Sequence, residues 1–477
     1  MVFSSILFVF MFLPAVLLVH FLVRGVRARN LVLLAASLLF YAWGEPVFVL
    51  AMIASILCNY VLALAIGKAG SFQIRKEILI LAIAANLALL FVFKYLNFTV
   101  KAANDLLQLE IPPTNIALPI GISFFTFQAM SYCVDVYRGD AGVQKNPLEL
   151  ALYISFFPQL IAGPIVRYNT ISEQIRGPRR ITAETFAYGV RRFLTGFLKK
   201  VILANNLSLA AHDQFQILDF SSAGHGAFFY WIGVFAYGLQ IFFDFSGYSD
   251  MAIGLGAMFG FRFEENFRYP FTAGTVTAFW QNWHISLGRW FRDYVYIPLG
   301  GSRVKPSRNI RNLFVVWLFT GIWHGANYTY IAWGLAFFVL LVIEKFVVRV
   351  ESRGKGMRVL WHVVTQLAIL FLWAMFNAVG IKQALHYWMA MLGLYGNGTG
   401  FTEPAVIRLF REYGVFMAAG LVFTYPTALR VAARVRENKT ISDIADIAVP
   451  VLYLAGFLWA VSYLVTGANN PFIYFMF

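Results

Sequence analysis

Residues 78–95 read ILILAIAANLALLFVFKY, an apolar run of 18 residues with one charged side chain, Lys94. A helix of this length rises about 27 Å, which is close to the thickness of a bilayer's hydrocarbon core. The run lacks the polar and apolar alternation of a lipid-facing barrel strand, and a lone strand would leave its backbone groups unsatisfied in lipid. The stretch therefore predicts a transmembrane helix.

Further apolar runs of similar length follow along the chain. They are Phe3–Val23, Val47–Ile66, Ile116–Tyr137, Ala227–Tyr248, Tyr328–Val348, Leu360–Val379 and Ile447–Val465. Shorter or mixed segments at Leu31–Trp43, Leu150–Val166, Leu313–Trp323 and Val406–Phe423 raise the expected total to about ten to twelve helices.

The composition agrees with a chain built for lipid. Hydrophobic residues make up 60% of the 477 residues and charged residues 13%, against about a quarter charged in soluble domains. No stretch is long and polar enough for a soluble domain. We therefore expect an all-α, multi-pass membrane protein, with residues 1–477 forming one integral membrane domain.

The net charge of +15 is distributed unevenly. Basic clusters lie at Arg24–Arg29, Lys68–Lys76, Arg303–Arg311, Lys345–Arg358 and Arg430–Lys439. Lys101 is the only lysine or arginine in three other segments, Asn97–Thr114, Asn206–Gly226 and Tyr395–Pro404. The positive-inside tendency places the first group in the cytoplasm and the second outside, as in a plasma or cell inner membrane. Because the clusters flank spans, they argue against nucleic-acid binding and favour contact with anionic membrane lipids or with an anionic donor such as a coenzyme A ester.

The alternation of inside and outside loops breaks between residues 150 and 205. Leu150–Val166 contains Pro158, Gly163 and Pro164, which suits a re-entrant element. Thr185–Leu203 carries apolar residues on one side and basic residues on the other, as in an interfacial helix or a span. We expect a re-entrant first element and a crossing second one.

Polar residues that are costly in hydrocarbon gather in the central third of the chain, and such residues mark cavities or sites by default. His324 directly follows the short apolar run Leu313–Trp323, which reaches only partway across a bilayer from a basic loop. Gly321 and Gly325 beside it allow close approach of backbone or substrate. The position suits a catalytic base, although a histidine bonded to a neighbouring helix would show the same pattern.

His284 lies in the sequence Trp280-Gln-Asn-Trp-His. Together with Asn282, Trp283, Trp323 and His324 it can line one aromatic, polar pocket. A zinc site is the competing interpretation, but neither histidine has a His-x3-His spacing or an acidic third ligand, so we expect no metal.

Two other polar groups admit structural as well as binding roles. Arg292 and Asp293 form a charge pair that favours anchoring of a loop, although substrate contact is an alternative. Asp244, Ser246 and Tyr248 either cap a segment or line a substrate channel, and the sequence does not separate these roles.

Several long motifs in fixed order carry a resemblance to a known family. They are Met1-Val-Phe-Ser-Ser, Tyr41-Ala-Trp, Leu118-Pro-Ile-Gly-Ile-Ser-Phe, Leu160-Ile-Ala-Gly-Pro, Asp244-Phe-Ser-Gly-Tyr-Ser-Asp, Trp283-His-Ile-Ser-Leu, Arg292-Asp-Tyr-Val-Tyr-Ile-Pro-Leu-Gly-Gly, Trp323-His-Gly-Ala-Asn and Asn470-Pro-Phe-Ile-Tyr-Phe. The chain resembles the membrane-bound O-acyltransferase (MBOAT) family over nearly its whole length, and within it the bacterial alginate O-acetyltransferase branch.

The resemblance implies that His324 is the essential histidine and His284 the second, upstream site residue. It also implies a cytoplasmic funnel for an acyl donor, a central tunnel, and extracytoplasmic acetyltransferase partner proteins that place the acetyl group on a polysaccharide. Gln281 and Asn282 stand where the alginate enzymes are expected to have two basic residues, which leaves the polymer open.

The resulting hypothesis is acetyl transfer from cytoplasmic acetyl coenzyme A, with no bound cofactor. The donor phosphates would lie near Arg303, Lys305 or Arg308, and His324 would act as base or relay the acetyl group. His284 and Asn282 would orient the donor or stabilise the oxyanion. The alternatives are transfer of another acyl group, such as D-alanine from a carrier protein, and a non-enzymatic transporter.

Overall fold

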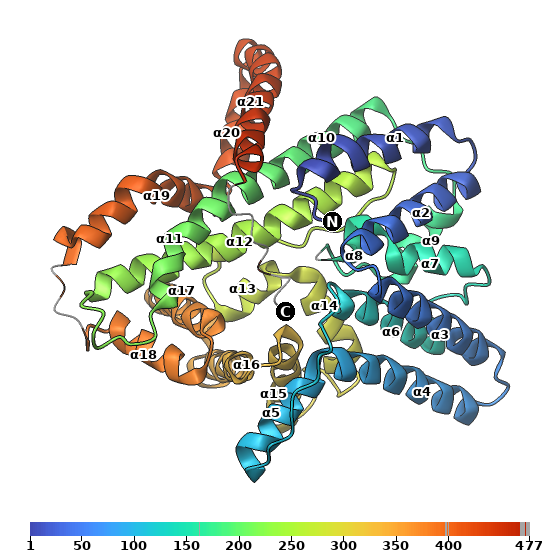
Figure 1. Ribbon diagram of the computed structural model, residues 1–477, viewed down its shortest axis with the longest axis horizontal. Coiled ribbons are helices and arrows are strands. Elements are labelled where there is room, and N and C mark those ends of the chain that lie inside the picture. Colours follow the sequence, from blue (N-terminus) through green and yellow to red (C-terminus); the bar gives the residue numbers. More distant parts are fainter. Residues whose placement is uncertain (162, 396–397, 399, 468–472, 474–477) are drawn as a thin grey trace. The chain divides into compact units, whose positions relative to one another are not determined.

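The computed structural model describes residues 1–161, 163–395, 398, 400–467 and 473 (Figure 1). Within these residues the secondary structure is helical and contains no strand. In this described part of the chain, seven helical segments are long and apolar enough to cross a membrane. The number is eight if the pair α19 (Pro404–Phe423) and α20 (Thr427–Glu437), which is bent by 67°, counts as one span. These segments confirm the multi-pass helical class. The expected total of ten to twelve includes shorter elements that these length and composition criteria leave out.

The seven segments match apolar runs or shorter segments of the sequence. They are α2 (Val26–Gly44), α3 (Phe48–Lys68), the continuous helix from α4 (Phe72–Leu90) through η2 (Phe91–Tyr95) to α5 (Leu96–Leu107), α12 (Ala227–Met258), α16 (Tyr328–Val342) with η6 (Ile343–Val348), α17 (Lys355–Asn377) and α21 (Lys439–Val465). A shorter apolar helix covers η1 (Phe8–Phe12) and α1 (Leu13–Leu22).

Two apolar runs form shorter helices than their composition suggests. The run Ile116–Tyr137 becomes helical only at α6 (Ile122–Arg138), because Pro119 lacks an amide hydrogen and Gly121 adopts a φ of 77°. Leu150–Val166 splits into α7 (Pro147–Ser155) and α8 (Phe157–Leu160) at Phe156, whose backbone is not helical. The split agrees with a broken element. Which of this segment and Thr185–Leu203 crosses the membrane stays a prediction.

The chain divides into two compact units. The first contains Met1–Phe193 and Tyr248–Glu265, and the second contains Leu194–Gly247 and Asn266–Phe477. The helices α10 (Ala183–Leu198) and α12 contribute residues to both. Whether residues 1–477 act as one membrane domain stays a prediction.

The first unit contains α1 to α9, the last of these being Tyr168–Arg176, and is held by aromatic and amide contacts. The rings of Phe3, Phe8, Phe40 and Phe157 form one buried cluster with centroid separations of 4.9–6.3 Å. The side chains of Asn59 and Asn86 exchange hydrogen bonds of 2.7 and 3.2 Å between α3 and α4. Because each amide satisfies the other, both can be buried among apolar helices.

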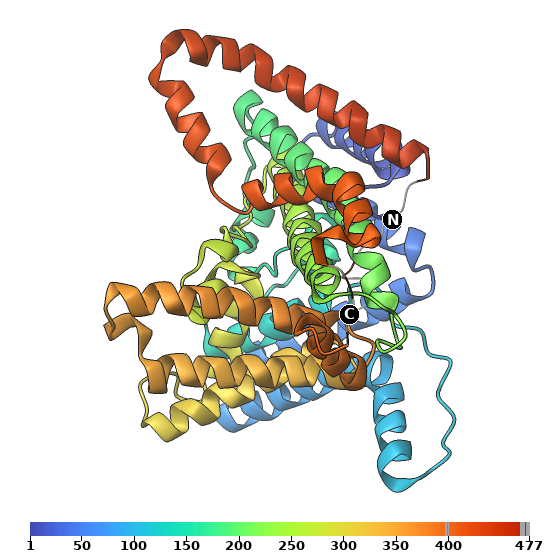
Figure 2. The ribbon, with the colours of Figure 1, turned by 90° about the vertical axis from the view of Figure 1, so that its left-hand side faces the viewer.

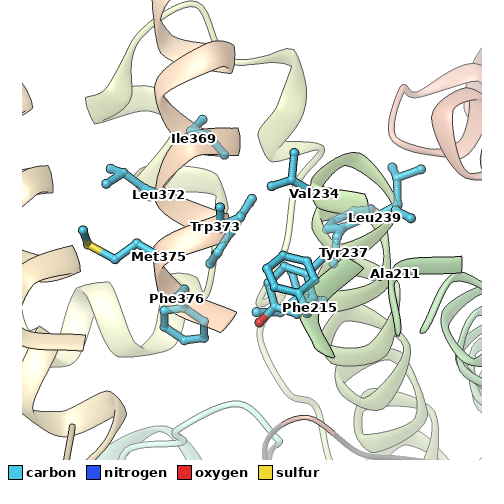
Figure 3. Close-up of a cluster of buried hydrophobic side chains, with 14 of the residues drawn as sticks. Ala211, Phe215, Val234, Tyr237, Leu239, Ile369, Leu372, Trp373, Met375 and Phe376 are labelled. Carbon is cyan, nitrogen blue, oxygen red and sulfur yellow. The ribbon is translucent and has the colours of Figure 1, made fainter. Parts of the chain in front are cut away.

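The second unit contains the following elements in chain order: η3 (Lys199–Ala204), α11 (Asn205–Gln216), η4 (Pro270–Thr272), α13 (Val276–Asn282), α14 (Ile285–Phe291), η5 (Arg292–Tyr296), α15 (Pro306–His324), α16, η6, η7 (Val350–Ser352), α17, α18 (Ile381–Met391), η8 (Gly400–Thr402) and α19 to α21. Its core joins α11, α12 and α17 through Phe215, Tyr237, Trp373 and Phe376 (Figure 3).

The helices α15, α16 and α17 lie side by side in this unit (Figure 2). Glycines permit the close approach of α15 and α16. A Cβ atom on Gly321 would lie 2.5 Å from the carbonyl oxygen of Tyr330, and one on Gly334 would lie 2.5 Å from that of Trp317. Small residues at helix contacts are typical of membrane bundles. This packing fixes the end of α15, where His324 lies.

Candidate active site

His324 is the last residue of α15, and its side chain is almost completely buried. Its imidazole lies among aromatic rings from three helices. The ring centroids are 5.0 Å from Trp323 on α15, 5.0 Å from Trp333 on α16 and 5.3 Å from Phe376 on α17. The three helices therefore fix the orientation of this histidine.

His284 lies between α13 and α14 and is also buried. Its backbone is left-handed, with a φ of 45°, a conformation that non-glycine residues adopt at an energetic cost and that clusters at functional sites. Its ring lies 4.6 Å from that of Phe245 and 5.9 Å from that of Trp323. Trp323 thus contacts both histidines.

A hydrogen-bond network defines the tautomer of His284. Oδ1 of Asn266 accepts hydrogen bonds from the backbone amide of Ser286 at 3.1 Å and from its hydroxyl at 2.9 Å, which identifies this atom as the amide oxygen. Nδ1 of His284 lies 3.2 Å from the same oxygen and therefore donates to it. The lone pair of the neutral ring is then on Nε2.

Burial also determines the charge of His284, which lies outside the helices that qualify as spans. Desolvation lowers the pKa of its imidazole well below the ordinary value, and the nearby His324 lowers that pKa further. His284 is consequently neutral at neutral pH.

Both histidines line a cavity of about 900 Å³ within the second unit. Its walls include Trp280, Trp283 and Trp317. Five basic side chains line it, namely Arg268, Arg289, Arg292, Lys345 and Arg349. Glu344 is the one acidic residue in the described lining. The cavity thus joins a basic region to a buried histidine pair.

The structure places some of the predicted site residues in this cavity and others elsewhere. Trp283, His284, Arg292 and His324 line it. Trp323 does not, but it contacts both histidines. The amide of Asn282 donates to the carbonyl of Ala278 within α13 at 2.8 Å.

Most of the remaining predicted residues have structural partners. Arg292 pairs with Asp293 at 2.7 Å. Asp244 pairs with Lys200 at 2.7 Å, and Tyr248 stacks on Phe3 with centroids 4.5 Å apart. Ser246 is buried on α12. The substrate-binding roles of these residues stay predictions.

Sequence reasoning identified the basic lining only in part. It pointed to Arg303, Lys305 and Arg308, whereas Ser302 is the residue of that loop that lines the cavity. Arg268 and Arg289 come from separate segments outside the basic clusters, so no local pattern reveals them. Lys345 and Arg349 lie in the basic cluster Lys345–Arg358 of the sequence. Glu344 carried a signal, since it is a carboxylate inside the apolar run Tyr328–Val348.

The described residues contain no group of three or more His, Cys, Asp and Glu side chains that could hold a metal ion. The zinc interpretation therefore gains no support from this part of the chain.

A multi-pass helical fold in which two buried histidines line a basic cavity is typical of a membrane enzyme. The sequence model of the MBOAT, membrane-bound O-acyltransferase family matches residues 71–381. The chain belongs to this family and is an O-acyltransferase.

Relatives that match over most of the chain have related names. The "Probable alginate O-acetylase AlgI" of Pseudomonas aeruginosa is 43% identical over 396 residues, which cover 82% of this chain and 75% of that protein. The protein of the same name from Azotobacter vinelandii is 38% identical over the full length of both chains. A peptidoglycan O-acetyltransferase of Helicobacter pylori is 34% identical, with 83% of this chain and 80% of that protein covered.

Proposed function

We propose that this protein takes an acetyl group from cytoplasmic acetyl coenzyme A and passes it across the cell inner membrane for O-acetylation of an exported polysaccharide such as alginate. The observation that carries the proposal is the cavity that connects five basic side chains with His284 and His324. The names of the relatives support an acetyl group and a polysaccharide acceptor.

The basic lining supports a donor with several phosphate groups. Guanidinium groups bind phosphate oxygens through paired, charge-assisted hydrogen bonds, and four of the five basic residues are arginines. A thioester of coenzyme A carries its phosphates on the nucleotide and its acyl group at the end of a narrow pantetheine arm. Phosphates on the arginines would therefore leave the thioester free to reach the histidines.

His324 is the proposed base. The acceptor hydroxyl oxygen attacks the thioester carbonyl, the carbon–sulfur bond breaks, and the hydroxyl proton passes to the imidazole and then to the departing thiolate. Transfer of the acetyl group through His324 itself is a variant of the same route. The tautomer of His284 presents an acceptor at Nε2, which favours orienting an O–H or N–H group over stabilising an oxyanion.

The proposed partners lie on opposite sides of the membrane. The basic loops indicate that the donor arrives from the cytoplasm. Extracytoplasmic acetyltransferase partner proteins would receive the acetyl group and place it on the polysaccharide.

Reconstitution in liposomes tests the proposal. Labelled acetyl coenzyme A is supplied on the cytoplasmic face, and label is followed to a hydroxyl acceptor on the other face. We expect donor-dependent transfer by wild type. Transfer only from a D-alanyl carrier protein would show that the transferred group is D-alanyl and not acetyl. Movement of a solute across the membrane without any thioester would support a transporter.

A further inference from the structure

Glu344 is a buried carboxylate inside a helix that is long and apolar enough to span a membrane, and it lines the cavity. It lies on η6, the continuation of α16. Acidic residues at such positions are costly and are retained where they bind a partner. Its partners are in the same unit.

Both oxygens of Glu344 accept hydrogen bonds from the protein. Oε2 accepts from the backbone amide of Val276 at 2.6 Å and from the indole of Trp361 at 2.8 Å. Oε1 accepts from the backbone amide of Thr277 at 3.0 Å and from its hydroxyl at 2.5 Å. Four donors therefore converge on one carboxylate, and three of them belong to the first turn of α13.

The segment that starts at these donors ends at His284. The other end is held by Asn266, whose carbonyl oxygen accepts from the amide of Ile285 at 3.0 Å and whose side chain bonds Ser286 and His284. Between these two anchors α13 presents Trp280 and Gln281 to the cavity. Because α13 is short and helical, a displacement of its first turn is transmitted to Trp280 and His284.

We infer that Glu344 is a positioning residue for acyl transfer, which acts by fixing α13 and through it the cavity wall and His284. The inference rests on the proposed function. Glu344 does not act on the substrate, since the protein's own donors occupy both of its oxygens.

The chemistry of the carboxylate suggests a sharp substitution. In Glu344→Gln one acceptor oxygen becomes an NH2 group, which would face either Val276 and Trp361 or Thr277. Aspartate is too short to bridge the same donors. Thr277→Val and Trp361→Phe each remove one donor and keep the carboxylate, whereas Thr277→Ser keeps all four bonds.

The test measures acetyl transfer against acetyl coenzyme A concentration for these variants of the full-length protein in liposomes. We expect kcat to fall on the order of 10- to 100-fold in Glu344→Gln, with a smaller change in the donor KM, because misplacement by about 1 Å costs catalysis that much. The kcat of Thr277→Val and of Trp361→Phe should fall less, and the kcat of Thr277→Ser should match that of wild type. Glu437→Gln, an exposed glutamate, is the control.

Hydrogen–deuterium exchange supplies a readout that does not depend on acetyl transfer. Exchange in peptides covering residues 273–286 should rise in Glu344→Gln and stay at the wild-type level in Glu437→Gln. Wild-type kcat and unchanged exchange in Glu344→Gln would overturn the inference. If Glu344→Gln does not fold, wild-type kcat in both Thr277→Val and Trp361→Phe would overturn it instead. Absence of acetyl transfer by wild type would refute the proposed function, and the exchange data would still decide whether Glu344 fixes α13.

Discussion

Nζ of Lys200 lies 2.7 Å from Oδ1 of Asp244, and both side chains are almost completely buried. The ammonium group also donates to Oδ1 of Asn205 at 2.9 Å, and Oδ2 of Asp244 accepts from the backbone amide of Ile473 at 2.9 Å. The sequence left open whether Asp244 caps a segment or lines a channel. These partners favour a structural role, in which the carboxylate connects η3, α12 and the chain near its end.

Removal of one member of this pair should destabilise the protein. Lys200→Ala leaves a buried carboxylate without its cation, which costs about 3–5 kcal/mol in buried pairs. Thermal unfolding in detergent measures the effect. Lys200→Met combined with Asp244→Asn removes both charges and keeps an acceptor for Ile473, so it should recover most of the stability. Equal loss in the single and double variants would show that the ion pair is unimportant.

The lowered pKa of His284 predicts a dependence of stability on pH. The unfolded chain binds a proton at this residue below about pH 6.5, whereas the folded protein does not, so stability falls as the pH decreases. The loss is at most about 2 kcal/mol at pH 5. The decrease in Tm between pH 7 and pH 5 should be smaller in His284→Gln than in wild type. His212→Gln, at an exposed position, should behave as wild type, and the same result in both variants would contradict the assignment.

The basic lining predicts a phosphate-dependent donor affinity. Arg289→Gln should raise the donor KM by about tenfold, because a charge-assisted hydrogen bond is lost. Arg303→Gln, in the loop that the sequence favoured, lies outside the described lining and should have little effect. Steady-state kinetics with acetyl coenzyme A and with its dephospho form measure the donor KM of both variants. A larger effect of Arg303→Gln on the donor KM would instead support the interpretation from the sequence, in which the donor phosphates lie near Arg303.

The contact between α15 and α16 predicts a steric effect near His324. Gly321→Ala places a methyl group against the Tyr330 carbonyl and should cost about 1–3 kcal/mol, with loss of transfer activity as α15 shifts. Gly356→Ala, in the first turn of α17, has no atom within 4 Å of the added methyl group. It should leave both Tm and activity unchanged. Wild-type behaviour of Gly321→Ala would contradict the packing described for these helices.

The sequence was most informative about the spans. Runs such as 78–95 and Tyr328–Val348 are long because lipid demands a helix of that length, so local composition suffices to find them. Helix starts were less accurate. The predicted run begins at Ile116, but the helix begins at Ile122, after the non-helical Pro119–Gly121. The apolar residues on both sides of this break gave it the composition of a continuous helix.

The site was predictable only in part. His284 and His324 were identified because each is a polar residue in an apolar setting, and they meet in one cavity. Arg268, Arg289 and Arg349 lie in three separate segments and come together through tertiary packing alone. The exact role of each histidine stays a prediction.

Acetyl transfer by His324→Ala tests the central claim most directly. Purified variant and wild type are reconstituted at equal levels with labelled acetyl coenzyme A on the cytoplasmic face, and His212→Ala serves as the histidine control. The account predicts that His324→Ala loses nearly all transfer to the external acceptor, while its Tm and donor binding stay close to wild type. Wild-type transfer by folded His324→Ala would contradict it.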